Sequence, residues 1–239
     1  MAKKKKILIT AGPTQEAIDP VRFLSNYSSG KMGYALAKEC AKAGHVVTLV
    51  SGPTNLLPPK NCRVIGVKTA QQMYTEVLKR FPANDIVFKV AAVADYHIKN
   101  SFKKKIKKSE DTLLLKLVKN PDILQKLGTL KKPHQVLVGF AAETHEGVNY
   151  ARKKLKEKNL DWIALNEISR KNVGFGSDEN EVTLIAHDGK KIRIPKQSKE
   201  KVARFILRTV LKVSLDEESR FNFKRFKAIS FLKLFRKAS

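Results

Sequence analysis

Short apolar runs alternate with amphipathic stretches along most of the chain, and this alternation predicts the elements. Lys5–Thr10 is an apolar run closed by a Gly-Pro turn, which is typical of a buried strand. Gly30–Ala43 places its apolar residues on one stripe and is followed by Gly44, a common helix stop, so we expect a helix there. Between these two elements, a polar loop is expected up to about Ser29.

The same reasoning predicts further elements downstream. Strands are expected over His45–Val50, Asp85–Ala92, Thr112–Val118, Val136–Ala141 and Trp162–Leu165. Helices are expected over Thr69–Arg80, from Pro121 onward, over Val148–Lys158 and over Ser198–Val213. Strands that alternate with helices favour parallel βαβ units, so the fold class is α/β: a Rossmann-like, doubly wound, mostly parallel sheet.

Two segments depart from this alternation. Asp95–Asp111 is basic and mostly polar, and we interpret it as a flexible basic flap. Val182–Ala186 and Lys191–Ile194, joined across Asp188-Gly189, predict a small β-hairpin extension with a two-residue turn.

The domain organisation follows from where the pattern stops. Residues 1–213 form one predicted domain, and residues 214–239 form a basic C-terminal extension of unknown role. Phe and Leu alternate with Lys and Arg in this tail. A loosely packed extension and a basic amphipathic helix that touches a membrane or a partner both fit that composition.

The net charge of the chain indicates which kinds of ligand and partner it can bind. The 239 residues carry 48 Lys+Arg against 22 Asp+Glu, a formal net charge of +26, which favours anionic ligands. The basic residues are spread over many segments without a standard nucleic-acid motif, so no nucleic-acid partner is expected. No apolar run is long enough to span a membrane, and the run after Lys3–Lys6 is too short for a signal peptide. Cys40 and Cys62 show no pairing pattern, so we expect a cytoplasmic protein.

The start of the first predicted helix is a candidate anion cradle. Ser28, Ser29 and Gly30 precede a helix N-terminus, where free N–H groups and the helix dipole favour negative charge. An ordinary helix cap is the alternative. Neither GxGxxG nor GxxxxGK[ST] occurs, and the second strand ends at Ser51 without the acid that holds a nicotinamide ribose. These absences count against an oxidoreductase.

The predicted flap supplies a second group of cations. It carries Lys103, Lys104, Lys105, Lys107 and Lys108. A run of lysines usually forms an exposed, solvated surface. Here the run follows the carboxyl end of a buried strand, where open α/β sheets place their ligands, so closure over a polyphosphate is the alternative.

Six blocks, in one order, resemble the phosphopantothenoylcysteine synthetase family over about residues 5–213. The blocks are Ile9–Gly33, AAVADY from Ala91 to Tyr96, KKIKK from Lys104 to Lys108, Val118–Leu124, GFAAET from Gly139 to Thr144, and Gly174–Ile185. The resemblance is to the bacterial, CTP-dependent type of phosphopantothenate–cysteine ligase, in a stand-alone form without the decarboxylase domain.

The resemblance implies a ligase reaction of coenzyme A biosynthesis. The carboxylate of 4′-phosphopantothenate attacks the α-phosphate of CTP, which gives an acyl-cytidylate and pyrophosphate. The amine of L-cysteine then attacks the acyl group, and CMP leaves. Mg²⁺ accompanies the triphosphate, and the family forms homodimers in which one subunit can complete the site of the other. The choice of CTP over ATP comes from the resemblance alone.

The family's functional residues map onto positions of this sequence. Lys105 matches the flap lysine that acts at the α-phosphate, and Asn26 matches the asparagine that holds the acyl-cytidylate for attack by the amine. Asp95 resembles the nucleotide-contacting aspartate. Further nucleotide-site positions match Ala91, Pro121, Asp122, Ile123, Leu124, Phe140, Lys154 and Lys158.

Some positions depart from the family, and some chemistries lack support. Tyr27 stands where the family often has a basic residue, and Glu167 stands where it usually has Asp.

No Cys/His cluster has the spacing of metal ligands, so no structural metal site is expected. A nicotinamide-dependent reductase and a nucleic-acid-binding module are the rival classes. Pyrophosphate release that depends on phosphopantothenate separates them from a ligase.

Overall fold

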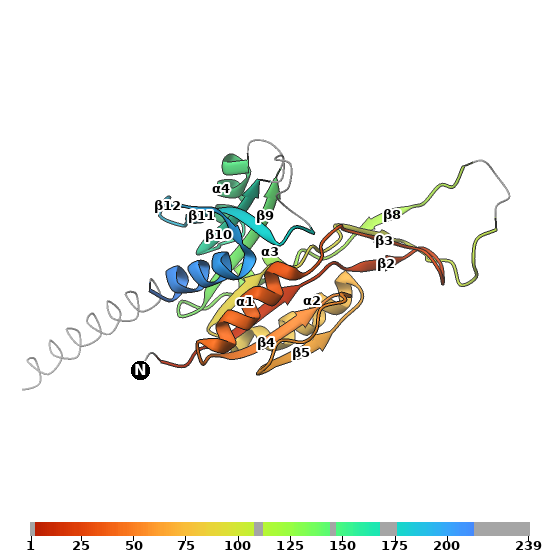
Figure 1. The fold of residues 1–239 in the computed structure, drawn as a ribbon. Coiled ribbons are helices and arrows are strands. Elements are labelled where there is room, and N and C mark those ends of the chain that lie inside the picture. Colours follow the sequence, from red (N-terminus) through yellow and green to blue (C-terminus); the bar gives the residue numbers. More distant parts are fainter. Residues whose placement is uncertain (1–2, 108–111, 144–146, 168–175, 213–239) are drawn as a thin grey trace, which may run out of the picture.

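The computed structural model describes residues 3–107, 112–143, 147–167 and 176–212 (Figure 1). The predicted tail, residues 214–239, and Lys108 of the predicted flap lie outside these ranges.

An eight-stranded sheet forms the centre of the molecule. Its order is β12-β11-β10-β9-β6-β1-β4-β5, and the six strands from β10 to β5 are parallel. Numbered along the chain, these six lie in the order 3-2-1-4-5-6 from the β5 edge, which is the Rossmann arrangement. The predicted doubly wound, mostly parallel sheet is therefore confirmed. The parallel strands are β1 (Lys6–Ala11), β4 (Val46–Ser51), β5 (Cys62–Gly66), β6 (Ile86–Lys89), β9 (Val136–Glu143) and β10 (Trp162–Glu167).

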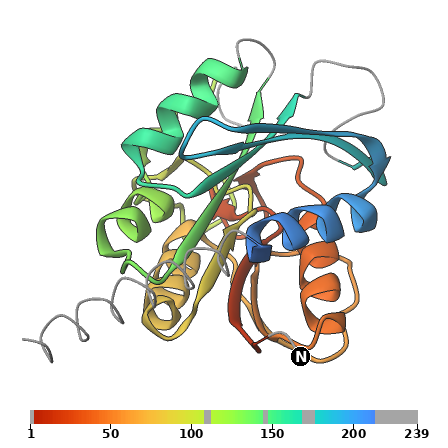
Figure 2. The same cartoon turned by 90° about the vertical axis from the view of Figure 1, so that its left-hand side faces the viewer.

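Helices cover both faces of the sheet (Figure 2). One face packs against α1 (Lys31–Lys42) and a helix over residues 199–212. The other face packs against α2 (Ala70–Arg80), α3 (Ile123–Leu130) and α4 (Gly147–Glu157). A short 3₁₀ turn, Phe81–Ala83, follows α2.

The sequence of β1 explains why a continuous apolar run forms the central strand. Ile7 and Ile9 point into the core under α1, while Leu8 points into the core under α2 and α3, and all three are fully buried. A strand that is covered on both faces needs apolar residues at successive positions, unlike a strand with one wet face.

An antiparallel hairpin extends the sheet beyond β10, as predicted. β11 (Glu179–Ala186) pairs with β10 and with β12 (Lys191–Ser198). The predicted two-residue turn is wrong, because Ala186 still pairs with Lys190, and the loop has three residues, His187 to Gly189. Gly189 is the last residue of this loop. Its φ of 88° makes it the left-handed residue that follows the turn in three-residue hairpin loops.

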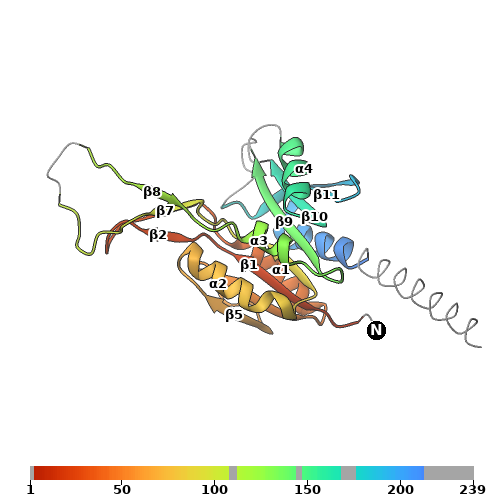
Figure 3. The same ribbon diagram turned by 180° about the vertical axis from the view of Figure 1, so that it is seen from behind.

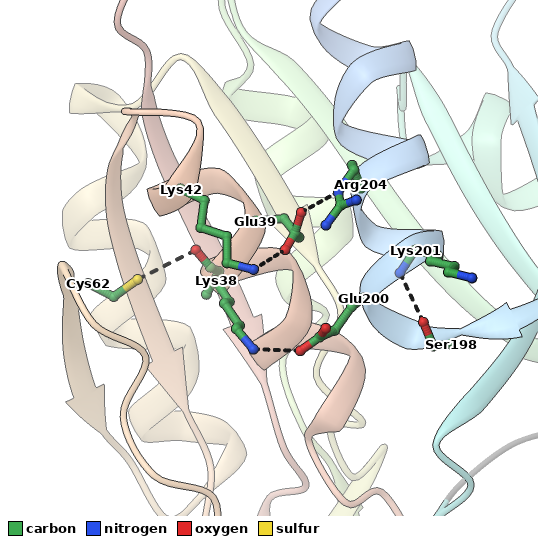
Figure 4. Close-up of polar contacts among 9 residues, drawn as sticks. Lys38, Glu39, Lys42, Cys62, Ser198, Glu200, Lys201 and Arg204 are labelled. Carbon is green, nitrogen blue, oxygen red and sulfur yellow. Dashed lines mark hydrogen bonds and ion pairs between the residues drawn. The ribbon is translucent and has the colours of Figure 1, made fainter.

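Ion pairs tie the helix over residues 199–212 to α1 (Figure 4). The buried carboxylate of Glu39 accepts hydrogen bonds from Arg204 at 2.7 Å and Lys42 at 2.9 Å. The guanidinium of Arg204 thereby holds the pKa of Glu39 below its ordinary value, although burial acts in the opposite direction. Lys38 and Glu200 form a second pair at 2.6 Å.

An arm projects from the sheet (Figures 1 and 3). It consists of two antiparallel ribbons, β2 (Gln15–Ala17) with β3 (Phe23–Ser25), and β7 (Tyr96–Ile98) with β8 (Leu117–Lys119). The first ribbon lies in the segment predicted as a polar loop. Its strands are three residues long, too short for a periodic signal.

The second ribbon is the stem of the predicted flap. The backbone N–H of Ile106 donates to the Asp19 carboxylate at 3.1 Å, and Arg22 donates to the Ile106 carbonyl at 3.1 Å. The described part of the segment is therefore fastened to the first ribbon. The predicted strand Thr112–Val118 is wrong in extent, since only Leu117–Lys119 pairs. Leu114, which precedes the paired residues, is 94% exposed.

Candidate active site

Two adjacent pockets lie at the carboxyl ends of β1, β6 and β9, where the strand order of the sheet reverses. This switch point is the usual ligand position in open α/β sheets. The glycine pocket, about 240 Å³, is lined by Gly12, Gly30 and Gly33 among others. The aspartate pocket, about 540 Å³, is lined by Asp95 and Asp122 among others. The two pockets share four lining residues: Lys89, Val93, Phe140 and Lys154.

The floor of the glycine pocket is the start of α1. Gly30 has φ 79° and precedes the helix, which begins without a side-chain cap. The hydroxyl of Ser28 accepts a hydrogen bond from the Gly30 N–H at 3.4 Å, and Ser29 also lines the pocket. An uncapped helix N-terminus beside hydroxyl groups provides donors for a phosphate or a carboxylate.

Gly33 lets α1 lie directly against the end of β1. A Cβ atom at this position would stand 2.6 Å from the Cβ of Ala11 and 3.1 Å from the Thr10 carbonyl oxygen. Only a residue without a side chain permits this approach. The close packing fixes the helix N-terminus beside the strand ends that form the rest of the pocket.

Asn26 stands at the mouth of the glycine pocket. Its side-chain amide donates to the carbonyl of Ala92 at 3.0 Å, which orients the carboxamide toward the end of β6. An amide group carries two N–H donors, so one remains for a ligand. This geometry suits a group that holds an acyl carbonyl.

Thr10 shapes the strand ends. Its buried hydroxyl accepts hydrogen bonds from the N–H groups of Val90 and Ala91, both at 3.1 Å. These bonds turn the chain out of the sheet, so β6 ends at Lys89 and not at Ala92 as the apolar run predicted. The turn brings Ala91 into the wall of the glycine pocket.

Paired charges line the aspartate pocket. Asp122 caps α3 by accepting from the Gln125 N–H at 2.9 Å and pairs with Lys158 at 2.7 Å. Burial raises the pKa of Asp122, but the hydrogen bonds from Lys158 and Gln125 outweigh it and leave this pKa below its ordinary value. Lys154 pairs with Glu143 at 2.6 Å. An anionic ligand can compete with these carboxylates for the two lysines.

The structure brings all but one of the predicted site residues into the two pockets. Those in the glycine pocket are Asn26, Ser28, Ser29, Gly30, Ala91, Phe140 and Lys154. Those in the aspartate pocket are Asp95, Pro121, Asp122, Ile123, Leu124, Phe140, Lys154 and Lys158. Lys105 lines neither pocket and is exposed on the arm.

Sequence reasoning missed several lining residues. Asn166 at the end of β10 and Asn180 on β11 both line the glycine pocket, and each has a buried side-chain oxygen without a hydrogen-bond partner among the described residues. Lys89 lines both pockets. A lysine inside the apolar run of β6 was the available signal for that residue. The sequence carries no signal that would have selected Asn166 or Asn180.

A third cavity, about 450 Å³, lies outside α1 beside Leu57. Two ion pairs line it, Lys31 with Asp178 at 2.7 Å and Lys38 with Glu200. Its charges thus already serve to hold neighbouring segments together.

Two features are absent from the part of the chain that the structure describes: a metal-ligand cluster and a membrane-spanning helix. Within residues 3–107, 112–143, 147–167 and 176–212, no cluster of three or more His, Cys, Asp or Glu side chains could hold a metal ion. In the same part of the chain, no helix combines the length and the apolar character needed to cross a membrane.

The fold and the pockets define a Rossmann-like α/β protein with a candidate ligand site at its switch point. Comparison with known families then identifies it: residues 2–213 match the model described as "DNA/pantothenate metabolism flavoprotein C-terminal domain". The chain belongs to this family, which confirms the resemblance found in the sequence.

Individual relatives agree with this assignment. The coenzyme A biosynthesis bifunctional protein CoaBC of Bacillus subtilis (strain 168) is 48% identical over 211 residues, which are 88% of this chain and 52% of the relative. The chain thus spans about half the length of the curated relatives it matches.

Solved structures give the same result. A crystal structure of the C-terminal domain of CoaBC is 42% identical, with a TM-score of 0.77 over 90% of this chain and 98% of that domain. A Cab2 variant in complex with phosphopantothenate-cysteine has a TM-score of 0.70 over 91% of this chain and 89% of its own, at 18% identity, and shows similarity of fold alone.

Proposed function

We propose that the chain is a phosphopantothenate–cysteine ligase of coenzyme A biosynthesis that uses CTP and acts in the cytoplasm. The observation that carries the proposal is the pair of pockets that meet at Lys89, Phe140 and Lys154. Two anionic ligands can lie there with their reactive ends together. The relatives named CoaBC support the pathway.

The glycine pocket suits the acyl donor. The start of α1 offers N–H and hydroxyl donors to its phosphate. The unpartnered oxygens of Asn166 and Asn180 can accept from the hydroxyl and amide groups of a pantothenoyl chain. The carboxylate would then point toward the residues that both pockets share.

The aspartate pocket suits the nucleotide. Lys154 and Lys158 stand one helical turn apart and can bind the phosphates, while Pro121–Leu124 form the wall beside them. A carboxylate oxygen attacks the α-phosphorus, and the bond to pyrophosphate breaks. Mg²⁺ would enter with the triphosphate, because this ion keeps phosphate and water oxygens as its main partners.

The second half-reaction forms the amide. The amine nitrogen of cysteine attacks the acyl carbon, the bond to the CMP oxygen breaks, and the amine loses a proton. Asn26 would hold the acyl carbonyl through its second N–H, where charge develops in the transition state.

We further propose a homodimer in which the arm of one subunit reaches the site of its partner. Lys105 lies in the segment between β7 and β8 of the arm and lines neither pocket of its own subunit. The arm also exposes large apolar side chains, among them Val21, Phe23, Phe102, Leu114 and Leu117. An arm with such a surface is expected to pack against another chain.

The decisive experiment supplies phosphopantothenate and cysteine with each nucleoside triphosphate in turn. We expect pyrophosphate, CMP and phosphopantothenoylcysteine with CTP, and much less turnover with ATP. Omission of phosphopantothenate should abolish pyrophosphate release. If no triphosphate yields pyrophosphate under these conditions, the proposed ligase function is wrong.

A further inference from the structure

Lys89 occupies a position that the resemblance assigned to no role. It is the last residue of β6, at the switch point of the sheet, and its side chain lines both the glycine pocket and the aspartate pocket. Only Val93, Phe140 and Lys154 share this property among the described residues. Any reaction between ligands in the two pockets takes place beside it.

Among the described residues, the ammonium group of Lys89 has a hydrogen-bond acceptor but no carboxylate in direct contact. It donates to the carbonyl of Ala91 at 2.9 Å. Lys154 and Lys158 each pair with a carboxylate, whereas no carboxylate of the described residues lies within 4.0 Å of Lys89. A cation that is withdrawn from water without an opposite charge is unfavourable, unless a ligand supplies that charge.

The groups around Lys89 also disfavour its charged form. Burial lowers the pKa of Lys89 to about 8. Asp122 of α3 and Asp95 before β7 raise this pKa, and Lys158 and Lys154 of the α4 region lower it. The lysine is thus largely charged at neutral pH and loses its charge in mildly basic solution.

We propose that Lys89 is a catalytic residue that binds the reacting anions, the carboxylate of the acyl donor and the α-phosphate of the nucleotide, where the two pockets meet. The proposal rests on the ligase function proposed above. Two negative groups must come into contact for the oxygen–phosphorus bond to form, and a cation between them offsets their repulsion. Lys89 keeps its proton throughout, and the electron pair leaves with pyrophosphate.

Three variants test this role: Lys89→Met, Lys89→Arg, and Lys126→Met as a control. Lys126 is an exposed residue of α3 that lines neither pocket. Hydroxylamine serves as the trap, so that acyl-nucleotide formation is measured without cysteine. Lys89→Met should slow this step by roughly a hundred- to a thousand-fold, because one electrostatic contact to the transition state is lost. Lys126→Met should be unchanged.

The pH profile distinguishes a charge effect from a structural one. The value of kcat/KM reports groups of the free enzyme. For the wild type, kcat/KM of acyl-nucleotide formation should fall above about pH 8, following the pKa of Lys89. Lys89→Arg should retain activity and lose this decline, because arginine stays charged.

A binding measurement makes the proposal independent of turnover. Inorganic pyrophosphate should raise the melting temperature of the wild type and of Lys126→Met, and should raise that of Lys89→Met by a smaller amount, because Lys154 and Lys158 remain in the pocket of this variant. Without ligand, Lys89→Met should melt above the wild type, because a half-buried charge without a carboxylate in direct contact is removed. If the wild type forms no acyl-nucleotide while these shifts appear, the ligase proposal fails and Lys89 remains an anion-binding residue.

Three outcomes overturn the proposal. In the first, Lys89→Met binds pyrophosphate and forms acyl-nucleotide like the wild type. In the second, it slows only the cysteine step, which would make Lys89 a base for the amine. In the third, the ligand-free variant is destabilised while its response to pyrophosphate is normal, which would make the contact with Ala91 purely structural.

Discussion

Replacement of Gly33 by alanine tests whether the close contact between α1 and β1 sets the geometry of the glycine pocket. The added Cβ would stand 2.6 Å from the Ala11 Cβ and 3.1 Å from the Thr10 oxygen. Carbon atoms in contact prefer about 4 Å, so the helix start must move by roughly 1 Å. Such overpacking costs about 1–3 kcal/mol.

A favourable effect offsets part of this penalty. Alanine is better than glycine inside a helix by about 1 kcal/mol. We therefore expect the free energy of unfolding of Gly33→Ala to fall by up to about 2 kcal/mol. Catalysis should suffer more, since a displacement of about 1 Å can reduce a rate a hundred-fold.

Urea denaturation and pyrophosphate release measure the two effects. Gly66→Ala is the matched control, because a Cβ at Gly66 meets nothing within 4 Å. Adding Ala11→Gly to Gly33→Ala removes the facing Cβ and should recover part of both losses. The reasoning is refuted if Gly33→Ala matches the control in stability and turnover, or if Ala11→Gly makes the double variant worse by the sum of the single effects.

Three further predictions concern single side chains. Arg204→Met should lower the free energy of unfolding at pH 7, because Glu39 loses a charge-assisted hydrogen bond. The pKa of Glu39 is lowered in the folded state, so its contribution is complete above the ordinary value of 4.5 and is lost at more acid pH. The urea curves of the wild type and of Arg204→Met should therefore converge as the pH falls below 4.5, and a constant gap between them would contradict this assignment. Asn26→Asp should still release pyrophosphate but accumulate acyl-cytidylate, detected by mass; blocked pyrophosphate release with normal nucleotide binding would place Asn26 in the first step. Lys105→Gln should abolish acyl-nucleotide formation without changing the melting temperature, and unchanged pyrophosphate release would remove Lys105 from the mechanism.

The sequence predicted those strands of the fold whose burial leaves a continuous pattern. β1 is apolar at successive positions because both of its faces are covered. β5 was missed, since it lies at the sheet edge, is only half buried and carries the exposed Arg63. The ribbon of β2 and β3 was missed because it depends on contacts such as that of Asp19 with Ile106, 87 residues away. Local periodicity carries no information about such partners.

The candidate site divides in a similar way. Motif resemblance selected residues that the fold gathers at one end of the sheet, since that end is where parallel strands deliver their loops. The resemblance could not place Lys105 in space, because the position of this residue depends on the path that the arm takes. Asn166 and Asn180 gained meaning only through their unpartnered oxygens, because hydrogen-bond satisfaction is a property of the packed chain.

The glycine pocket draws on both ends of the domain, which has a consequence for synthesis on the ribosome. Lys31 at the start of α1 pairs with Asp178, and Lys199 lines the pocket and donates to the Ser177 carbonyl. A growing chain emerges from its N-terminus, so β1 and α1 are available long before these partners. The nascent protein therefore cannot complete the pocket until the helix over residues 199–212 has left the exit tunnel. Substrate in the cell can stabilise only the finished domain.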